Sequence, residues 1–472
     1  MGGTVNNQIK SSRVEENGIS DTKERTTCKV DPFEPAADVT RVKSSGTLLS
    51  FGASSGNGHV TFLVTVVMVL ATAWLALHLS KPKSGDGTIL SDTPEIKANV
   101  ALVETGGSHD EVVAALYHAL GSLGGVYTSM YLSLPRFGIE NIYAWIKRRY
   151  RLSPYDLLRP YTLEADSTSI PDSIILATCE HDVYTVDTAL HYYYQNGPKT
   201  QNLICVMHHV DGFKAVEERV RRWARAGRLR FMTLSTHTTK ALREETRKCD
   251  PTLYDNVPID TFPPVFPAPL SLNPPPSDRI AIAIQGNFED TRRDYLQTLL
   301  DFERMIDELP APIVSRLQFI LAGHGKQVGV PAKVLPYVSV NFSLDYIPYY
   351  NLLHEAFALI PSFADEGYYS SKASSSIPAS FIANTPILGS RRLLESYGYL
   401  SGESIWTIDE NEGGEIHAVY EILREHFDDN GMERESWKMA IEKKRWAVRQ
   451  RALELMTENT KLMHEIVFNQ SS

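Results

Sequence analysis

The sequence has few cysteines and no excess of positive charge, and both shortages restrict what the chain can be. Its four cysteines, at positions 28, 179, 205 and 249, are widely separated and show no CxxC spacing. This excludes a zinc ribbon and argues against a disulfide framework. Cys205 lies in an apolar run, LICVM, which predicts a buried, inert thiol. A formal net charge of −10, without a strongly basic domain, argues against nucleic-acid binding.

Two other common patterns are missing. No GxGxxG motif is present, which weakens a prediction of nicotinamide dinucleotide binding. His208 and His209 are adjacent, so their side chains point to opposite sides of a strand, and no third ligand follows at a suitable spacing. We therefore expect no metal site. His208 remains a candidate general base or hydroxyl-binding residue at a strand end that faces a cleft, with a purely structural role as the alternative.

Long apolar runs are also scarce, apart from one of membrane-spanning length. Residues 60–79 read VTFLVTVVMVLATAWLALHL, without an acid, lysine or arginine, and their length matches a bilayer core. We expect a single-pass transmembrane helix there, since the position is too far into the chain for a signal peptide. The polar residues 1–58 before it predict a disordered tail, and residues 80–97 a stem.

The orientation of this anchor is open from the sequence. Lys81 and Lys83 directly after the apolar run favour a cytosolic main domain by the positive-inside rule. A short tail, anchor, stem and large domain is typical of lumenal membrane enzymes, and glycosylation sequons begin at Asn341 and Asn469. We expect a Golgi or endoplasmic reticulum protein with a lumenal main domain, and keep the cytosolic side as the alternative.

Residues 98–265 alternate short apolar strands with helices. Strands are predicted at 99–104, 124–132, 173–178, 202–207 and 229–234, and a helix that starts after Ser108, its expected N-cap, separates the first two. Right-handed crossovers make such a sheet parallel. Gly106 and Gly107 follow the first strand and would let the backbone approach a ligand, or simply form a tight turn.

A proline-rich linker separates this region from a second one of the same kind, residues 278–430. Residues 258–276 contain eight prolines, which excludes a helix or a central strand. A strand at 280–284 then runs into Gly286, and a helix is predicted from Thr291, opening with Arg292 and Arg293. Arginines near a glycine loop suit a diphosphate. Further strands are predicted at 318–322, 338–342 and 356–360, and residues 431–468 form a charged helical tail.

The stretch FALIPSFADEGYYSSKASSSIPASFIANTPIL, residues 357–388, reads as strand, loop, helix and strand. In an open α/β sheet such a loop lies at the carboxyl edge, where ligands bind. Glu366 is suited to hydroxyl groups, and Lys372 with the following serines is suited to phosphate. We expect this loop to bind a ligand that carries both.

Several of these features together resemble GT-B glycosyltransferases of the retaining family 4 type, from about residue 99 to the end. The features are the Gly106–Gly107 loop, IAIQGNFED, FILAGHGK, LIPSF followed by an acidic loop, and NTPIL. The resemblance implies two Rossmann-like domains facing a cleft, with the nucleotide sugar on the second and the acceptor on the first. It implies transfer from a nucleoside-diphosphate sugar to a hydroxyl of a glycan, lipid or protein, with no metal and no cofactor.

Carried over residue by residue, the resemblance implies a role for ten positions. Glu366 would face the sugar hydroxyls, and His208 would lie on the acceptor side. The implied donor-binding residues are Gly106, Gly107, Gly286, Arg292, Arg293, Lys326, Lys372 and Ser374.

One position departs from the family pattern. The family places a second acid eight residues after the first, where it holds the ribose, and Ser374 occupies that position here. The departure motivates an alternative, a non-catalytic membrane-tethered binding or scaffold protein of the same fold. Another α/β enzyme, such as an epimerase or dehydrogenase, is a third possibility.

Overall fold

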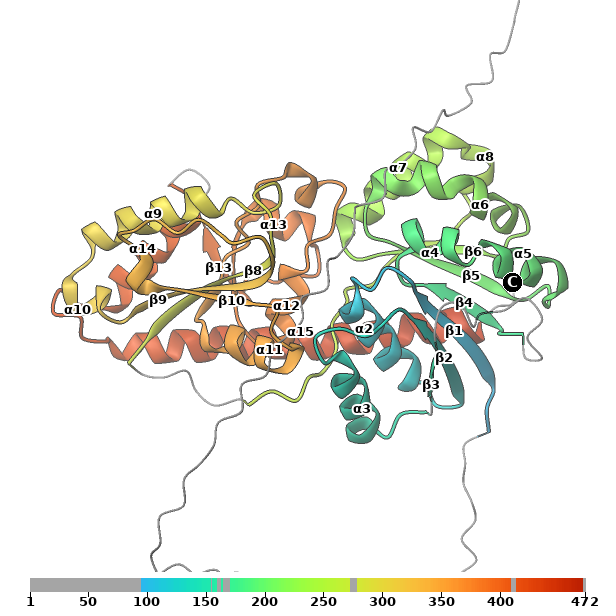
Figure 1. The fold of residues 1–472 in the computed structure, drawn as a ribbon, viewed down its shortest axis with the longest axis horizontal. Coiled ribbons are helices and arrows are strands. Elements are labelled where there is room, and N and C mark those ends of the chain that lie inside the picture. Colours follow the sequence, from blue (N-terminus) through green and yellow to red (C-terminus); the bar gives the residue numbers. More distant parts are fainter. Residues whose placement is uncertain are drawn as a thin grey trace, which may run out of the picture. The chain divides into compact units, whose positions relative to one another are not determined.

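The computed structural model describes residues 95–153, 155–158, 163, 170–271, 278–408 and 413–469, which all belong to one compact unit, Thr93–Ser472. Figure 1 shows them as two groups of strands covered by helices. The predicted tail and transmembrane segment lie outside the described residues, as does most of the predicted stem. Within residues 95–469, apart from the gaps, no helix combines the length and apolarity needed to cross a membrane.

The first domain is a seven-stranded parallel sheet in the order β3-β2-β1-β4-β5-β6-β7. Its strands are β1 (Ala98–Glu104), β2 (Val126–Leu132), β3 (Tyr155–Leu158), β4 (Ser173–Leu176), β5 (Asn202–Met207), β6 (Leu229–Thr233) and β7 (Ile259–Thr261). Its helices are α2 (Asp110–Gly121), α3 (Ile139–Tyr150), α4 (Cys179–Thr185), α5 (Asp187–Asn196), α6 (Phe213–Arg225), α7 (Thr236–Cys249) and α8 (Pro251–Tyr254).

The second domain repeats this plan with a six-stranded parallel sheet in the order β10-β9-β8-β11-β12-β13. Its strands are β8 (Ile280–Phe288), β9 (Leu317–Gly325), β10 (Val338–Phe342), β11 (Ala358–Leu359), β12 (Ile387–Ser390) and β13 (Ile405–Ile408). Its helices are α9 (Tyr295–Glu308), α10 (Ala311–Val314), α11 (Tyr346–Glu355), α12 (Ser376–Ile382), α13 (Arg391–Ser396) and α14 (Gly414–His426). The prediction of two α/β domains with parallel sheets is confirmed.

In both sheets the strand order reverses beside the first strand, between β1 and β4 and between β8 and β11. Loops that leave two such neighbouring strands diverge to opposite faces, so a crevice opens between them at the carboxyl edge. The strands reach this edge because their apolar residues are buried on both faces, as in Leu102 and Val103 of β1. The fold therefore places a ligand crevice at the end of β1 and another at the end of β8.

The long final helix α15 (Glu435–Phe468) joins the two domains. It packs against α2 of the first domain and against α12 and β13 of the second, and Figure 1 shows it in red along both. Buried Asn459 donates a hydrogen bond of 2.7 Å to the carbonyl oxygen of Pro263 in the linker. Arg445 donates to the carbonyl oxygens of His354 and Ala356. The helix thus fixes both the linker and the second sheet.

The structure refines four local predictions. The linker begins with β7, an edge strand, which agrees with the exclusion of a helix or a central strand, and its Phe262, Val265 and Phe266 are core residues. His109, not Ser108, is the N-cap of α2, without a side-chain capping bond. Helix α9 begins at Tyr295, four residues later than predicted, because Asp294 caps it by accepting a hydrogen bond from the Gln297 amide.

The fourth correction concerns the cysteines. Cys205 is buried, as predicted, but it is not a thiol: it forms a disulfide with Cys179 at the start of α4. β4 and β5 are neighbouring strands in which Leu176 pairs with Cys205, and this register brings the residue just beyond β4 next to β5. The disulfide therefore joins the β4–α4 turn to the strand that ends in His208.

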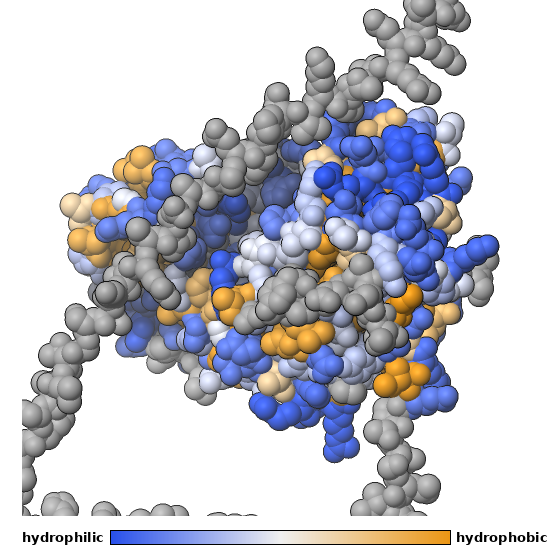
Figure 2. Space-filling view, turned by 45° about the vertical axis from the view of Figure 1, so that its right-hand side comes forward, coloured by the Kyte–Doolittle hydropathy of each residue, from blue (hydrophilic) through white to orange (hydrophobic). Residues whose placement is uncertain are grey.

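The surface on the side drawn in Figure 2 is largely hydrophilic, with hydrophobic residues gathered in smaller areas. This agrees with a chain in which 22% of the residues are charged. Exposed large apolar side chains are scattered over several elements, and on α15 they include Met439, Trp446 and Leu453. Single exposed apolar side chains are common in folded proteins and need no special explanation.

Candidate functional site

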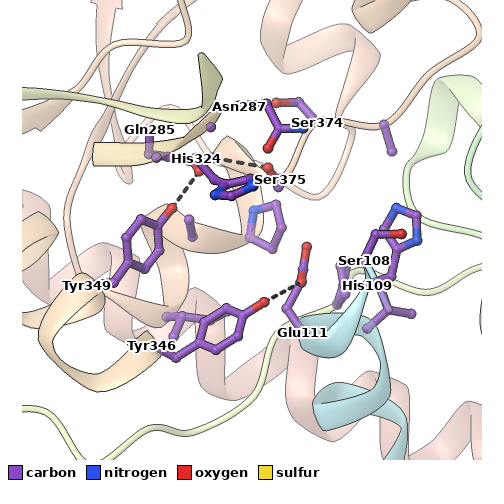
Figure 3. A pocket seen from close by; sticks show the side chains of 18 of the residues that line it. Ser108, His109, Glu111, Gln285, Asn287, His324, Tyr346, Tyr349, Ser374 and Ser375 are labelled. Atoms are coloured by element: carbon purple, nitrogen blue, oxygen red, sulfur yellow. Dashed lines mark hydrogen bonds between the residues drawn. The ribbon is translucent and has the colours of Figure 1, made fainter. Parts of the chain in front are cut away.

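A cleft of about 340 Å³ lies where the carboxyl edges of the two sheets face each other. Figure 3 shows its walls, with Glu111 and His109 from the loop and helix after β1, and Gln285 and Ser375 from the second domain. Among the residues that line it, Arg136, Arg292 and Arg293 are cations and Glu111 is the sole carboxylate. The cleft is therefore suited to an anionic ligand although the whole chain is acidic.

Arg293 is the most unusual residue of this cleft, because its side chain is only 3% exposed. The guanidinium donates to the hydroxyls of Ser374 and Ser376, at 3.2 and 3.0 Å, and to the carbonyl oxygen of Arg292. It also lies over the rings of Phe363 and Tyr368. No carboxylate of the described residues forms a salt bridge with it, and its Nε has no hydrogen-bond partner. A buried cation in this state favours the binding of an anion.

Gly286 makes room for this guanidinium. Its φ of +136° lies in a region of backbone conformation that residues other than glycine rarely adopt. A Cβ atom at this position would lie 3.3 Å from Nη2 of Arg293. Gly286 therefore permits both the turn at the end of β8 and the inward position of Arg293, and both residues line the cleft.

A chain of neutral hydrogen bonds extends the same wall. Gln285 donates from its amide to the hydroxyls of Ser375 and Ser376, at 3.3 and 2.9 Å, and accepts a 2.5 Å hydrogen bond from the Tyr349 hydroxyl. Figure 3 shows the contacts to Gln285 as dashed lines. Ser376 thus accepts from both Gln285 and Arg293. Ser376 itself is fully buried and does not line the cleft, so it positions the side chains of Gln285 and Arg293 from behind the wall.

In the glycine loop of the first domain, the amides of Gly107 and Ser108 already donate to a side chain of the same domain. Buried Glu104, the last residue of β1, accepts hydrogen bonds from the amides of Gly107 and Ser108, at 2.8 and 3.4 Å. Gly107 needs its glycine, because φ is +63° and a Cβ would lie 2.6 Å from the Ser133 hydroxyl. Neither Gly106 nor Gly107 lines the cleft, whereas the next two residues, Ser108 and His109, do.

Two histidines with closely spaced, mutually tilted rings, His109 and His208, belong to the first-domain wall. The rings of His109 and His208 lie 3.8 Å apart, and burial lowers the pKa of both, that of His208 to about 4. Nε2 of His208 lies 2.7 Å from the carbonyl oxygen of Ala177, so it carries the proton and Nδ1 is left as an acceptor. Nδ1 of His109 lies 2.8 Å from the Thr178 hydroxyl. Both imidazoles are neutral at pH 7.

Glu180 holds the backbone of His208 and His209 in place. One carboxylate oxygen accepts hydrogen bonds of 2.6 Å from the amides of both His208 and His209. Its other oxygen is buried without a partner, and burial raises the pKa of Glu180 to about 7. Glu180 directly follows Cys179, so the disulfide also stabilises the position of this carboxyl group.

The acid of the second-domain loop points elsewhere. The side chain of Glu366 is 76% exposed, pairs with Arg392 and does not line the cleft. Lys372 lies beside the cleft, but its Nζ forms a 2.6 Å ion pair with Asp365. That ion pair and the Gly367 amide hold the pKa of Asp365 below its usual value. The loop therefore brings Ser374 to the cleft and leaves Glu366 outside it.

The two remaining predicted phosphate ligands differ in position, because Arg292 lines the cleft and Lys326 does not. Arg292 lines the cleft with an exposed side chain whose Nε donates to Glu289 at 2.8 Å. Lys326 is exposed just beyond β9 and is absent from the cleft lining. Of the ten predicted site residues, the cleft brings together five: His208, Gly286, Arg292, Arg293 and Ser374.

The two walls touch directly at one end of the cleft. His209 and Lys372 form an antiparallel bridge, and the Val210 amide donates to the carbonyl oxygen of Ser371 at 3.0 Å. His237 of α7 contacts the carbonyl oxygens of Lys372 and Ser396, at 2.9 and 3.0 Å. Residues 371–373 are therefore held by the first domain, and they lead directly into the serines that bind Arg293.

Several cleft residues were not singled out as site residues from the sequence. Glu111 lies near the start of the helix predicted after Ser108, and Gln285 lies in the IAIQGNFED stretch, but neither is assigned a role by the sequence. Tyr346 and Tyr349 lie between the strands predicted at 338–342 and 356–360. The position of Gln285 beside Gly286, after a buried strand, was the one usable signal. In the described residues, no group of three histidine, cysteine or acidic side chains is arranged to hold a metal ion.

Neither a protein-family profile nor a curated protein matches the sequence. Solved structures do match, each over 78% of this chain. An α-glucosyltransferase in complex with UDP and DNA containing an HMU base has a TM-score of 0.50 at 10% identity, and 99% of its chain is covered. The same kind of enzyme with UDP-glucose and abasic-site DNA gives 0.49 at 11%, also over 99% of its chain. HepE from Anabaena, in complex with UDP and glucose, gives 0.48 at 9%, again over 99%. The chain thus has the GT-B fold of glycosyltransferases.

Proposed function

We propose that the protein is a glycosyltransferase that moves a sugar from a nucleoside-diphosphate sugar to a hydroxyl group. The observation that carries this proposal is Arg293, a buried cation in the cleft wall with hydroxyl and carbonyl partners but no salt bridge to a described carboxylate. A diphosphate would supply the missing negative charge. The GT-B fold supports the proposal as an analogy, since the fold alone does not determine function.

In the proposed reaction, Arg293 and the hydroxyls of Ser374 and Ser375 bind the diphosphate, and Gly286 admits it close to the backbone. The acceptor oxygen forms a bond to the anomeric carbon while the bond from that carbon to the phosphate oxygen breaks. The acceptor proton passes to the leaving diphosphate. Arg293 stabilises the charge that develops on this group, so catalysis comes from positioning and electrostatics.

The other predicted residues take secondary roles in this proposal. Arg292 extends the positive charge at the cleft, and Lys372 and Lys326 add to it from outside the lining. His208, with its free Nδ1, faces the acceptor. Glu366 reaches the sugar hydroxyls only if its loop moves from its ion pair with Arg392. Retention of configuration and independence from metals and cofactors are proposed from the resemblance to family 4 enzymes, and the acceptor is a glycan, lipid or protein.

We propose a lumenal location for the catalytic unit, anchored through residues 60–79. The Cys179–Cys205 disulfide supports this location, because disulfides persist in the secretory pathway and are rare in the cytosol. The location and the disulfide are therefore tested together.

Peptide mapping without reduction is expected to recover Cys179 and Cys205 as one cross-linked pair. Cys205→Ser is expected to lower the free energy of unfolding by roughly 3 kcal/mol, as for a loop of this length. Cys249→Ser, outside the pair, is the control and should have a much smaller effect. Recovery of both cysteines as thiols from protein isolated from its native membranes would contradict the lumenal location.

The proposed function itself is tested with a panel of nucleotide sugars. We expect one nucleoside diphosphate to raise the unfolding temperature of the full-length protein, and the corresponding sugar donor to be hydrolysed or transferred. Binding without any turnover would favour the alternative, a non-catalytic binding protein. Absence of binding to every nucleoside diphosphate would contradict the proposed function.

A further inference from the structure

Among the described residues, the second-domain wall of the cleft has no carboxylate, although a nucleotide carries a ribose diol that carboxylates commonly bind. Ser374 stands where the family resemblance expects an acid, and Glu366 points to solvent. The sole carboxylate in the lining is Glu111, in the first turn of α2 on the opposite wall. Figure 3 shows its side chain directed into the space between the two walls.

Glu111 is held by the second domain. Its Oε2 accepts a hydrogen bond of 3.2 Å from the hydroxyl of Tyr346 in α11. Burial raises the pKa of Glu111, and hydrogen bonds from its own amide and from Tyr346 oppose this shift. The Tyr346 amide donates at 2.8 Å to the carbonyl oxygen of Phe137, from the loop after β2. Phe137 has a φ of +51°, a strained conformation for a residue with a side chain, and this cross-domain bond helps to maintain it.

Flat rings lie on one side of Glu111. The Phe137 ring is 6.2 Å from that of Tyr346 and 5.7 Å from that of His324, and His324 is hydrogen-bonded to the Ser343 hydroxyl. All four residues line the cleft. Rings and hydroxyls of this kind suit the faces and edges of a planar base.

Tyr346 also links Glu111 to the phosphate-binding side chains. The Tyr346 ring is 6.4 Å from the Tyr349 ring, and Tyr349 is hydrogen-bonded to Gln285, which contacts the serines beside Arg293. The cleft therefore combines rings, a single carboxylate in its lining, hydroxyls and a guanidinium around connected side chains. A nucleoside diphosphate carries groups that match these: a base, a ribose diol and phosphates.

We propose that Glu111 binds the ribose hydroxyls of the nucleoside diphosphate, across the cleft from the domain that binds its phosphates. The inference rests on the proposed function, since it assumes a nucleotide ligand. It extends that function by making donor binding depend on both domains at once. A nucleotide bound to the second domain alone would lack its ribose contact, so binding would favour the arrangement in which the two walls face each other.

The test is calorimetry on the full-length protein with UDP, GDP and ADP, followed by the 2′,3′-dideoxy form of the tightest binder. Glu111→Gln is expected to weaken that nucleoside diphosphate roughly 10- to 100-fold, the usual effect of losing hydrogen bonds to a charged group. The wild type should discriminate against the dideoxy form by a similar factor. The variant should discriminate between the two forms by a smaller factor than the wild type, because a neutral amide oxygen accepts a weaker hydrogen bond from a ribose hydroxyl than a carboxylate does.

Two further variants keep the test decisive. Glu218→Gln, an exposed acid on α6, is the matched control and should bind like the wild type. Tyr346→Phe removes the hydroxyl that positions Glu111 and should weaken binding less than Glu111→Gln does. Thermal unfolding without ligand checks that each variant is folded.

The outcomes separate the inference from the proposed function. Binding that requires Arg293 but is unchanged in Glu111→Gln would overturn the inference and leave the proposed function in place, with Glu111 assigned to the transferred sugar or the acceptor. Equal affinity of the wild type for the ribose and dideoxy forms would also overturn it. Failure of the wild type to bind any of the three nucleotides would overturn both.

Discussion

Arg293→Met is expected to weaken nucleoside-diphosphate binding by roughly 100- to 1,000-fold, the effect of removing one partner from a buried, hydrogen-bonded charge pair. Among the described residues that line the cleft, Arg293 is the buried arginine, whereas Arg136 and Arg292 are exposed and screened by solvent. Calorimetry with the tightest-binding nucleotide measures the loss. A donor that turns over in the wild type should lose activity in the variant by a similar factor.

The same substitution should leave the unliganded protein about as stable as the wild type. Arg293 has no salt bridge to a described carboxylate, and its Nε has no partner, so removing the charge relieves a desolvation cost. Against this, the hydroxyls of Ser374 and Ser376 lose a donor, at about 1 kcal/mol each. The two effects nearly cancel, so the free energy of unfolding should change by no more than about 1 kcal/mol. Denaturant unfolding without ligand measures it.

Arg292→Met is the matched control, since Arg292 is adjacent, also lines the cleft, and is exposed and paired with Glu289. Its loss should weaken binding by no more than about fivefold, as for a solvent-screened charge. The assignment of Arg293 would be contradicted if the two variants bound the nucleotide equally well. It would also be contradicted if Arg293→Met unfolded the protein, because the residue would then be structural.

The elements were largely predictable from the sequence because their apolar patterns are local. β5 and β10 lie at the predicted residues, and the stretch after β11 has the predicted order of loop, helix and strand. The start of α9 was not predictable from apolar pattern alone. Asp294 is the N-cap that excludes Arg293 from the helix, and only outside the helix is Arg293 free to turn inward.

The cleft was less predictable than the elements, because its chemistry depends on contacts between distant residues. Glu111 and Tyr346 are separated by 235 positions and meet only when the two sheets face each other. Within the loop after β11, two adjacent acids compete: Asp365 pairs with Lys372, and Glu366 turns to Arg392 on the surface. The sequence identifies this loop, but the choice between neighbours depends on cations supplied by other elements.

The disulfide was also not predictable from the sequence, because it depends on the order of the strands in the sheet. Cys179 and Cys205 are 26 residues apart, without a spacing that is typical of cross-links. They meet because β4 and β5 are adjacent parallel strands. Cys179 lies in the turn after β4, next to Cys205 of β5. Such a contact depends on which strands are neighbours in the sheet, and the apolar pattern of the sequence does not determine this.

Gly286→Ala is expected to lower the free energy of unfolding by about 1–3 kcal/mol and to weaken nucleotide binding together with it. An alanine at φ +136° is strained, and its Cβ would lie 3.3 Å from Nη2 of Arg293. The guanidinium would have to shift by a few tenths of an ångström, which would lengthen its hydrogen bonds to Ser374 and Ser376 and weaken the anion site. The expected loss of affinity is at least roughly 10-fold, the effect of removing a charge-assisted hydrogen bond.

Gly329→Ala is the matched control for this prediction. A Cβ at Gly329 would meet nothing within 4 Å, and its φ is not in the left-handed region. That variant should keep its stability within about 0.5 kcal/mol and bind the nucleotide normally. Denaturant unfolding and calorimetry on both variants give the comparison. Equal behaviour of the two alanine variants would mean that Arg293 does not depend on Gly286 for its position, and the geometry proposed for the phosphate site would have to be abandoned.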